Sequence, residues 1–327
     1  MNVSIVVPAY NEATNIGRLL ESLLAQETKV ARILEIVVVA SGCTDATAEV
    51  ARQFGRGRPG LHVHVQERRE GKVAAINAYL RMRDPRAEIT VICSADLEVA
   101  HDVIEKLVLF FRERPDVGMA GGRPVPNNDG SKLVGRMVQV LWQLHHRVSL
   151  EVPKMGEVVA FRTALVEYVS ELSVVDEASI EDIVRAKGYK LGYVPDAVVT
   201  NHGPDNLGEF FEQRRRIARG HYWLAFAFGY EVATLDAPLL VKATLDTARA
   251  EDSLGKAALV AAIGTEVLAR AVGFWEARVV GGKHRTWRVL RSTKSLGDEG
   301  GAARPPTRAR RLSARPDPPD APTARRP

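Results

Sequence analysis

The sequence feature that most restricts the fold is a short apolar stretch that ends in acidic residues. Residues 89–93 are apolar or β-branched and predict a buried strand, and Asp96 and Glu98 follow shortly after it. Ligands of open α/β sheets bind outside the carboxyl ends of the strands, so carboxylates here are well placed to hold a metal ion and a phosphate. The alternative is that both acids belong to a solvated loop before a helix that Asp102 caps.

The residues on both sides repeat the order strand, loop, helix. Residues 3–7 predict a strand that Pro8 stops, and apolar residues recur at helical spacing over 16–24. Residues 33–39 predict another strand, apolar nearly throughout, as a parallel strand covered on both faces should be. Further strands are predicted at 61–66, 158–162, 191–194 and within 117–126, and further helices at 44–54, 73–82, 101–114, 132–150, from 163, up to 187 and at 207–227. This alternation predicts an α/β protein.

Charge and composition narrow the class of protein. The chain of 327 residues carries a net charge of +5, but much of the excess lies in arginines of the C-terminal tail, so a nucleic-acid-binding surface is not expected. Hydrophobic residues make up 46% and charged residues 26%, as is usual for a soluble globular protein. Cys43 and Cys93 are expected to be reduced thiols in a cytosolic protein. The first residues are expected to form a strand and not a signal peptide.

Two groups of basic residues point to an anionic ligand. Arg69 and Lys72 lie near the start of the helix over 73–82, where the helix dipole favours acids, so cations here suggest that a negatively charged group binds. The alternative is a solvated basic loop. Three consecutive arginines at 214–216 cover most of the circumference of the helix over 207–227, so at least one must face inward or toward a ligand. A diphosphate suits the guanidinium fork.

Acidic and histidine residues in the second half are candidates for chemistry. Glu181 and Asp182 are predicted to lie at the start of a helix, where acids usually just favour the dipole. The alternative is a general base beside a second acid, as transfer to a hydroxyl requires. His202 lies in a turn, where it is either exposed or closes a metal site. His145 and His146 point in different directions from one helix, so a shared metal is not expected.

In combination these residues resemble the family 2 glycosyltransferases of the GT-A fold. The resemblance covers roughly the first two-thirds of the chain and rests on short motifs in the family's order. They are Pro8-Ala9-Tyr10-Asn11-Glu12, Ser41-Gly42-Cys43-Thr44-Asp45, Gly71-Lys72-Val73-Ala74-Ala75-Ile76-Asn77, Ser94-Ala95-Asp96, Glu181-Asp182 and Gln213-Arg214-Arg215-Arg216. The resemblance implies a Rossmann-like α/β fold with a mixed sheet, helices on both faces and additional C-terminal helices.

The resemblance also implies an inverting transfer of a sugar from a nucleotide diphosphate donor, assisted by Mg2+ or Mn2+. Asp182 would be the base that deprotonates the acceptor hydroxyl, with Glu181 in support. Asp96 would bind the metal and the diphosphate. The other contacts to the donor would come from Pro8, Tyr10, Glu12, Ser41, Lys72, Ser94, Arg214, Arg215 and Arg216.

Three departures from the family pattern bear on the substrates. Ala40-Ser41 stands where the family commonly has two acids, so one usual contact to the base of the nucleotide is missing and the donor nucleotide stays open. Ser94-Ala95-Asp96 keeps one acid of the usual Asp-x-Asp, so Glu98, His202, water or the diphosphate would complete the metal's ligands. Ile217 replaces the Trp that accompanies polymerising members, which favours a single addition.

The C-terminal third predicts helices and a tail. Residues 257–271 are apolar, but Glu266 and Arg270 interrupt them, so no transmembrane helix is expected. Residues 239–275 are expected to pack on the catalytic domain as helices, or alternatively to lie at a bilayer surface. The predicted domains are the transferase domain over 1–230, a helical extension over 231–294, whose basic end at 283–294 could touch lipid headgroups or the donor, and a disordered Pro/Arg-rich tail over 295–327.

The sequence therefore predicts a cytoplasmic, metal-dependent inverting glycosyltransferase, alternatively peripheral at the inner face of the cell membrane. Its acceptor is open between a lipid phosphate, a soluble glycan and a small metabolite, and no nucleic acid is expected. One rival is a sugar nucleotidyltransferase, which would need a Gly-rich basic loop where Pro8 to Glu12 stand. The other is a non-catalytic sugar-nucleotide-binding protein, which would have no use for a base such as Asp182.

Overall fold

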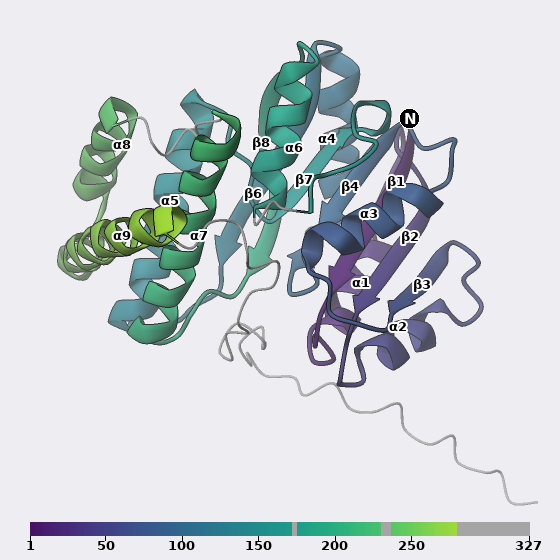
Figure 1. The fold of residues 1–327 in the computed structure, drawn as a ribbon, viewed down its shortest axis with the longest axis horizontal. Helices are drawn as coiled ribbons and strands as arrows, with labels where there is room; N and C mark the ends of the chain where they lie inside the picture. Colours follow the sequence, from purple (N-terminus) through teal and green to yellow (C-terminus); the bar gives the residue numbers. More distant parts are fainter. Residues whose placement is uncertain (172–174, 230–236, 280–327) are drawn as a thin grey trace, which may run out of the picture. The chain divides into compact units, whose positions relative to one another are not determined.

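The computed structural model describes residues 1–171, 175–229 and 237–279. Within these residues, the strands are β1 (Asn2–Ala9), β2 (Arg32–Ser41), β3 (Leu61–Gln66), β4 (Ile89–Cys93), β5 (Glu98–Val99), β6 (Val117–Pro126), β7 (Val158–Arg162) and β8 (Lys190–Asn201). The helices are α1 (Ile16–Leu24), α2 (Thr47–Gly55), α3 (Lys72–Met82), α4 (Val103–Glu113), α5 (Leu133–Glu151), α6 (Asp176–Ala186), α7 (Leu207–Phe228), α8 (Ala237–Ala250) and α9 (Ser253–Val279). Figure 1 shows their arrangement.

All strands belong to one mixed sheet, in the order β3-β2-β1-β4-β7-β6-β8-β5. The first four run parallel, whereas β7 is antiparallel to both β4 and β6, and β6 is parallel to β8. Because all the residues of β4 are buried, the expectation of a buried strand over 89–93 is confirmed. The carboxyl ends of β1, β2 and β4 lie at one edge of the sheet, where ligands of open α/β sheets bind.

Helices cover both faces of the sheet, because alternate residues of each strand point to opposite sides. On one side, Val3, Ile5 and Val7 pack with buried residues of α1 and α4. On the other side, Val6 packs with buried residues of α3 and α6. Two separate apolar cores therefore hold the sheet rigidly between helices. Cys43 and Cys93 are free thiols, as expected.

The C-terminal helices pack on the rest of the chain. α9 lies against α5 and α7, and α8 lies against α5, which confirms the preferred expectation for this region. Buried charges help to anchor α9: Glu266 binds Arg214 of α7 at 2.6 Å and Arg270 of its own helix at 2.8 Å. By length and composition alone, however, α9 is long and apolar enough to cross a membrane. Glu266 and Arg270 therefore do not exclude α9 by composition, and the expectation that no helix spans a membrane stays a prediction.

One predicted helix is wrong, and the helix that contains Glu181 and Asp182 begins at another residue than expected. The helix expected from Thr163 is a single 3-10 turn over Thr163–Leu165, and α6 begins only at Asp176. Asn77 explains part of this: its side chain donates to the carbonyl of Val169 at 2.8 Å and accepts from the Val169 N–H at 2.9 Å. These bonds replace the backbone bonds that a helix would make. Glu181 therefore lies in the middle of α6, not at its start.

Several predictions lie outside the described residues. These are the basic segment at 283–294, the tail at 295–327 and the domain boundary at 230/231.

Candidate active site

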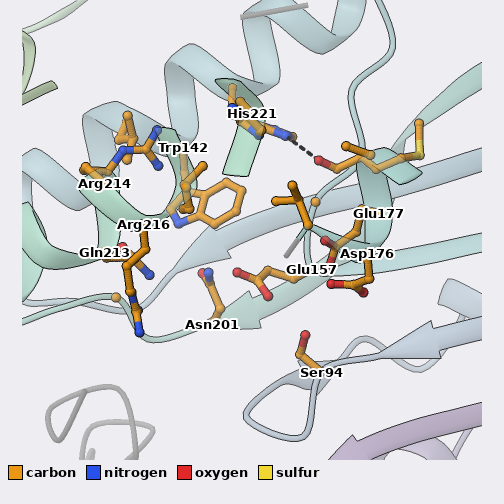
Figure 2. A pocket seen from close by; sticks show the side chains of 18 of the residues that line it. Ser94, Trp142, Glu157, Asp176, Glu177, Asn201, Gln213, Arg214, Arg216 and His221 are labelled. Atoms are coloured by element: carbon orange, nitrogen blue, oxygen red, sulfur yellow. Dashed lines mark hydrogen bonds between the residues drawn. The ribbon is translucent and has the colours of Figure 1, made fainter. Parts of the chain in front are cut away.

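A cavity of about 740 Å³ opens at the carboxyl ends of β1, β2 and β4 and extends between the C-terminal helices. Its size is in the usual range for small-molecule sites. Of the residues singled out in the sequence, the cavity is lined by Pro8, Tyr10, Glu12, Ser41, Lys72, Ser94, Asp96, Glu181, His202, Arg214 and Arg216. In the view of Figure 2, carboxylates from several elements gather on one side, and Gln213, Arg214 and Arg216 of α7 lie on the other.

The loops after β1 and β2 build one wall of this cavity. The guanidinium of Arg69 lies 3.9 Å from the ring centroid of Tyr10, in a cation–π contact. Gly42 makes this packing possible, because its φ is +62° and an added Cβ would lie 2.2 Å from the backbone nitrogen of Arg69. Glu12 is buried beside them and accepts a hydrogen bond of 2.9 Å from Asn15. The wall therefore combines a flat aromatic surface with a positive charge and a fixed carboxylate.

Ser94, Asp96 and Glu157 form an acidic centre below this wall. β7 runs antiparallel beside β4, with Cys93 opposite Val158, so Glu157, the residue before β7, comes next to Ser94. Burial and the nearby charge of Asp96 raise the pKa of Glu157 to about 7. Two carboxylates that compete in this way are good ligands for a hard divalent cation. The described residues contain no group of three His, Cys, Asp or Glu side chains that could hold a metal ion, so water or a bound diphosphate would complete the shell.

Lys72 and two acids of α6 form a second charged group in the cavity. The Nζ of Lys72 lies 2.9 Å from Asp176 and 2.6 Å from Glu177. Burial and the charge of Glu177 raise the pKa of Asp176 to about 7. Burial alone would also raise the pKa of Glu177, but the Lys72 ammonium holds it below its ordinary value. Both carboxyls line the cavity beside Lys72, and burial favours the protonated form of Asp176.

Three predicted site residues do not line the cavity. Glu98 is exposed and belongs to β5, where it pairs with Thr200 of β8. Asp182 is half-buried, and burial raises its pKa, but it lies beyond the cavity wall. Arg215 pairs instead with Glu212 at 2.7 Å and with Glu276 of α9.

His202 and Glu181 line the cavity but already have structural partners. The ring of His202 is bonded to Asn127 at 2.7 Å and to Asp205 at 2.9 Å. Glu181 accepts the backbone N–H of Met155 at 3.2 Å and so holds the loop that carries Glu157.

Five lining residues were missed in the sequence: Lys154, Glu157, Asp176, Glu177 and Asn201. Asp176 and Glu177 had a readable signal, since they occupy the first turn of a helix that ends before Gly188. Asn201 is 6% exposed, and among the described residues its Oδ1 has no hydrogen-bond partner. The pairing of β7 with β4, which places Glu157, has no signal in the local sequence.

Two family models and several curated proteins match the sequence of this chain. The family model described as "Glycosyl transferase family 2" matches residues 4–171, and one described as "Glycosyl transferase family group 2" matches residues 89–272. A dodecaprenyl-phosphate galacturonate synthase of Rhizobium johnstonii is 27% identical over 254 residues, which cover 70% of this chain and 72% of that protein. The glycosyltransferase AglE of Haloferax volcanii is 36% identical over 75 residues, which cover 23% of this chain and only 24% of AglE.

A solved structure confirms the fold. The mannosyltransferase PcManGT of Pyrobaculum calidifontis, in complex with GDP-Man and Mn2+, superposes with a TM-score of 0.54 and 23% sequence identity over 86% of this chain and 85% of that one. The predicted GT-A fold, with its mixed sheet and additional helices, is therefore confirmed.

Proposed function

The chain belongs to glycosyl transferase family 2, and we propose that it transfers a sugar from a nucleotide diphosphate donor to its acceptor with inversion at the anomeric carbon, assisted by Mg2+ or Mn2+. The observation that carries this proposal is the meeting of Asp96, Glu157, Lys72 and Arg216 in one cavity. Two acids suited to a cation and two cations suited to a diphosphate come from four different elements. A pure packing core would not bring these charges together.

The donor fits the polar end of the cavity. The nucleoside would lie against Tyr10 and Arg69, whose stacked pair offers a flat surface, with Glu12 near its polar edge. Lys72 and Arg216 would bind the diphosphate and stabilise the charge that develops as it leaves. The unpartnered Oδ1 of Asn201 would accept a hydrogen bond from a hydroxyl of the sugar.

Asp96 and Glu157 fit a divalent cation, because both are carboxylates and the pKa of Glu157 responds to Asp96. When bound, Mg2+ or Mn2+ supplies positive charge to the diphosphate oxygens. The presence of Mn2+ with GDP-Man in PcManGT supports this role. Glu98 and His202 take no part in this proposal, because one is exposed in β5 and the other is held by Asn127 and Asp205.

We assign the proton acceptor on the acceptor side to Asp176 and not to Asp182. Asp176 lines the cavity, and burial and Glu177 raise its pKa to about 7. Glu181 has a structural role in this proposal, because it accepts the backbone N–H of Met155 and so holds that loop. Ile217 also lines the cavity, and the absence of a Trp at this position supports a single addition.

Calorimetric titration with UDP and GDP, in Mn2+ and in EDTA, tests the donor site. We expect one nucleotide to bind more tightly in Mn2+ than in EDTA, and Asp96→Asn and Glu157→Gln to weaken that binding at least tenfold. Glu98→Gln is the matched control, since it removes an exposed acid two residues from Asp96 and should leave binding unchanged. Binding that is equal in EDTA, or that survives both site substitutions, would contradict the proposed metal and diphosphate site.

A further inference from the structure

Away from the nucleotide wall, one wall of the cavity carries many apolar side chains. It lies between α5, α8 and α9, and its lining includes Leu141, Leu144, Val148, Leu240, Ile263 and Val267. A soluble saccharide would find few hydrogen-bond partners along these side chains, whereas a hydrocarbon chain would be removed from water there. This part of the cavity therefore combines an apolar wall with the charged side chains of Lys154, Arg214, Glu266 and Arg270.

Lys154 stands in this helical part of the cavity, where the charges of Arg214, Glu181 and Glu266 act on it. Lys154 lies in the loop between α5 and β7, and its Nζ forms no hydrogen bond or ion pair with another residue of the part that the structure describes. Its cationic neighbours differ in this respect, because Arg214 and Arg270 both bind Glu266. Burial and the charge of Arg214 lower the pKa of Lys154 to about 8, so it is mostly protonated at neutral pH. A protonated amine in such a place suits an anionic group of a ligand.

The apolar side chains of the cavity wall adjoin apolar side chains on the outer surface of α9. Ile263 and Val267 of α9 line the cavity and are also 39% and 63% exposed, so the cavity reaches the surface beside them. Val260, Leu268 and Trp275 of the same helix are exposed as well. Exposed apolar side chains at this density mark a surface that meets a membrane or a partner, and the length and composition of α9 match a bilayer.

We propose that the acceptor is a phosphate-bearing membrane lipid, whose phosphate binds at Lys154 and whose hydrocarbon chain lies along the apolar wall between α5 and α9. This inference rests on the proposed glycosyl transfer and names its acceptor. The lipid enters from the bilayer through the opening beside Ile263 and Val267, so the enzyme works at a membrane surface. A lipid is favoured over a soluble phosphate because the apolar wall and the apolar outer surface are continuous.

The transfer step balances with this acceptor. An oxygen of the lipid phosphate forms a bond to the anomeric carbon while the bond from that carbon to the donor diphosphate breaks. The nucleoside diphosphate leaves with the electron pair. A phosphate monoester carries at most one proton on average near neutral pH, and a proton on the attacking oxygen passes to Asp176.

Vesicle flotation of the full chain tests the acceptor without a sugar donor. Phosphatidylcholine vesicles that contain a polyprenyl phosphate are compared with vesicles that contain the matching polyprenol. We expect binding to be about tenfold or more tighter with the phosphate lipid. Lys154→Met should abolish this preference and Lys154→Arg should keep it. Lys242→Met is the matched control, since Lys242 is on the outside of α8 and pairs with Glu151.

Equal binding to both kinds of vesicle, or a preference that survives Lys154→Met, would overturn the inference. Competition by inorganic phosphate at the same concentration as the lipid would also overturn the inference, because the hydrocarbon chain of the lipid would then contribute nothing to binding. The nucleotide titration separates the two proposals. If a nucleotide binds with Mn2+ but the phosphate preference is absent, only the acceptor assignment fails; if neither is observed, the proposed function fails with it.

Discussion

At the scale of single residues, Lys72 pairs with the acids of α6, and we propose that it also binds the donor diphosphate. Lys72→Met should lower kcat by about 100-fold, because a cation aimed at the leaving diphosphate is lost and because Asp176 and Glu177 lose the ammonium that orients them. Steady-state kinetics with the preferred donor measures this effect. Lys190→Met is the control, since Lys190 forms an exposed pair with Asp116. A kcat within threefold of wild type would show that Lys72 does not act on the leaving group.

The pKa of Lys154 leads to a prediction about how the preference for the phosphate lipid depends on pH. Lys154 is faced by the cations Arg214 and Arg270, the acids Glu181 and Glu266, and the buried histidines of α5 and α7. Burial, together with the charge of Arg214, lowers its pKa to about 8. A lysine is charged below its pKa, so the preference for the phosphate lipid should be full at pH 7 and should decline as the pH rises through about 8. Flotation at pH 6.5 to 9.5 measures it.

The control for this pH dependence is Lys154→Arg, because arginine stays protonated over that range. Its preference should therefore show no decline. A decline of the same size in both proteins would place the titrating group elsewhere.

Residue chemistry was easier to predict than residue position. Of the acids, lysine and arginines that the sequence predicted for the donor, Asp96, Lys72, Arg214 and Arg216 line the cavity, because motif residues after strands recur at one edge of an α/β sheet. The sequence indicated Glu181 and Asp182 as the acidic pair, whereas the cavity contains Asp176 and Glu177. The choice depended on where a helix begins, which local pattern fixes poorly. Glu157 was out of reach, because its place depends on the long-range pairing of β7 with β4.

At the scale of elements, α9 is held to α7 by a buried ion pair, which gives a stability prediction. Despite burial, Arg214 and Arg270 lower the pKa of Glu266 to about 2. Glu266→Ala removes the carboxylate that both arginines bind and should lower the free energy of unfolding by about 3 kcal/mol. Urea unfolding followed by circular dichroism measures this loss. An unchanged midpoint would mean that apolar packing alone docks α9.

The same pair should respond to acid. Since the pKa of Glu266 is lower in the folded protein than its ordinary 4.5, its contribution is complete above that pH and disappears as the pH falls toward about 2. The difference in unfolding free energy between wild type and Glu266→Ala should shrink accordingly.

Strands and most helices followed from periodicity, because apolar runs and helical spacing are local properties. The failures were elements that depend on distant partners. The segment after Thr163 packs Val166 and Val169 into the core and binds Asn77, so it is not helical. Glu266 and Arg270 were taken as interruptions of an apolar helix, whereas both line the cavity beside Ile263 and Val267 of the same helix and pair with each other, and Glu266 also pairs with Arg214 of α7.

At the scale of the whole molecule, the exposed face of α9 should bring the enzyme to membranes. Replacing Val260, Leu268 and Trp275 with serine, serine and glutamine should weaken binding to phosphatidylcholine vesicles at least tenfold, because apolar surface no longer enters the lipid. The thermal midpoint should change little, since these side chains are exposed. Val65→Ser, on the exposed side of β3, is the control. Unchanged vesicle binding of the triple variant would remove α9 from the membrane contact.

The most direct test of the central claim is a transfer assay with inversion as its readout. The full chain, in vesicles that contain a polyprenyl phosphate, is given radiolabelled UDP-sugars and GDP-sugars with Mn2+, and the lipid product is isolated and its anomeric configuration determined by NMR. The account predicts transfer from one donor, with the anomeric configuration opposite to that of the donor, and loss of transfer in Asp96→Asn. Transfer with retained configuration, or no transfer from any donor to this lipid or to soluble acceptors, would contradict it.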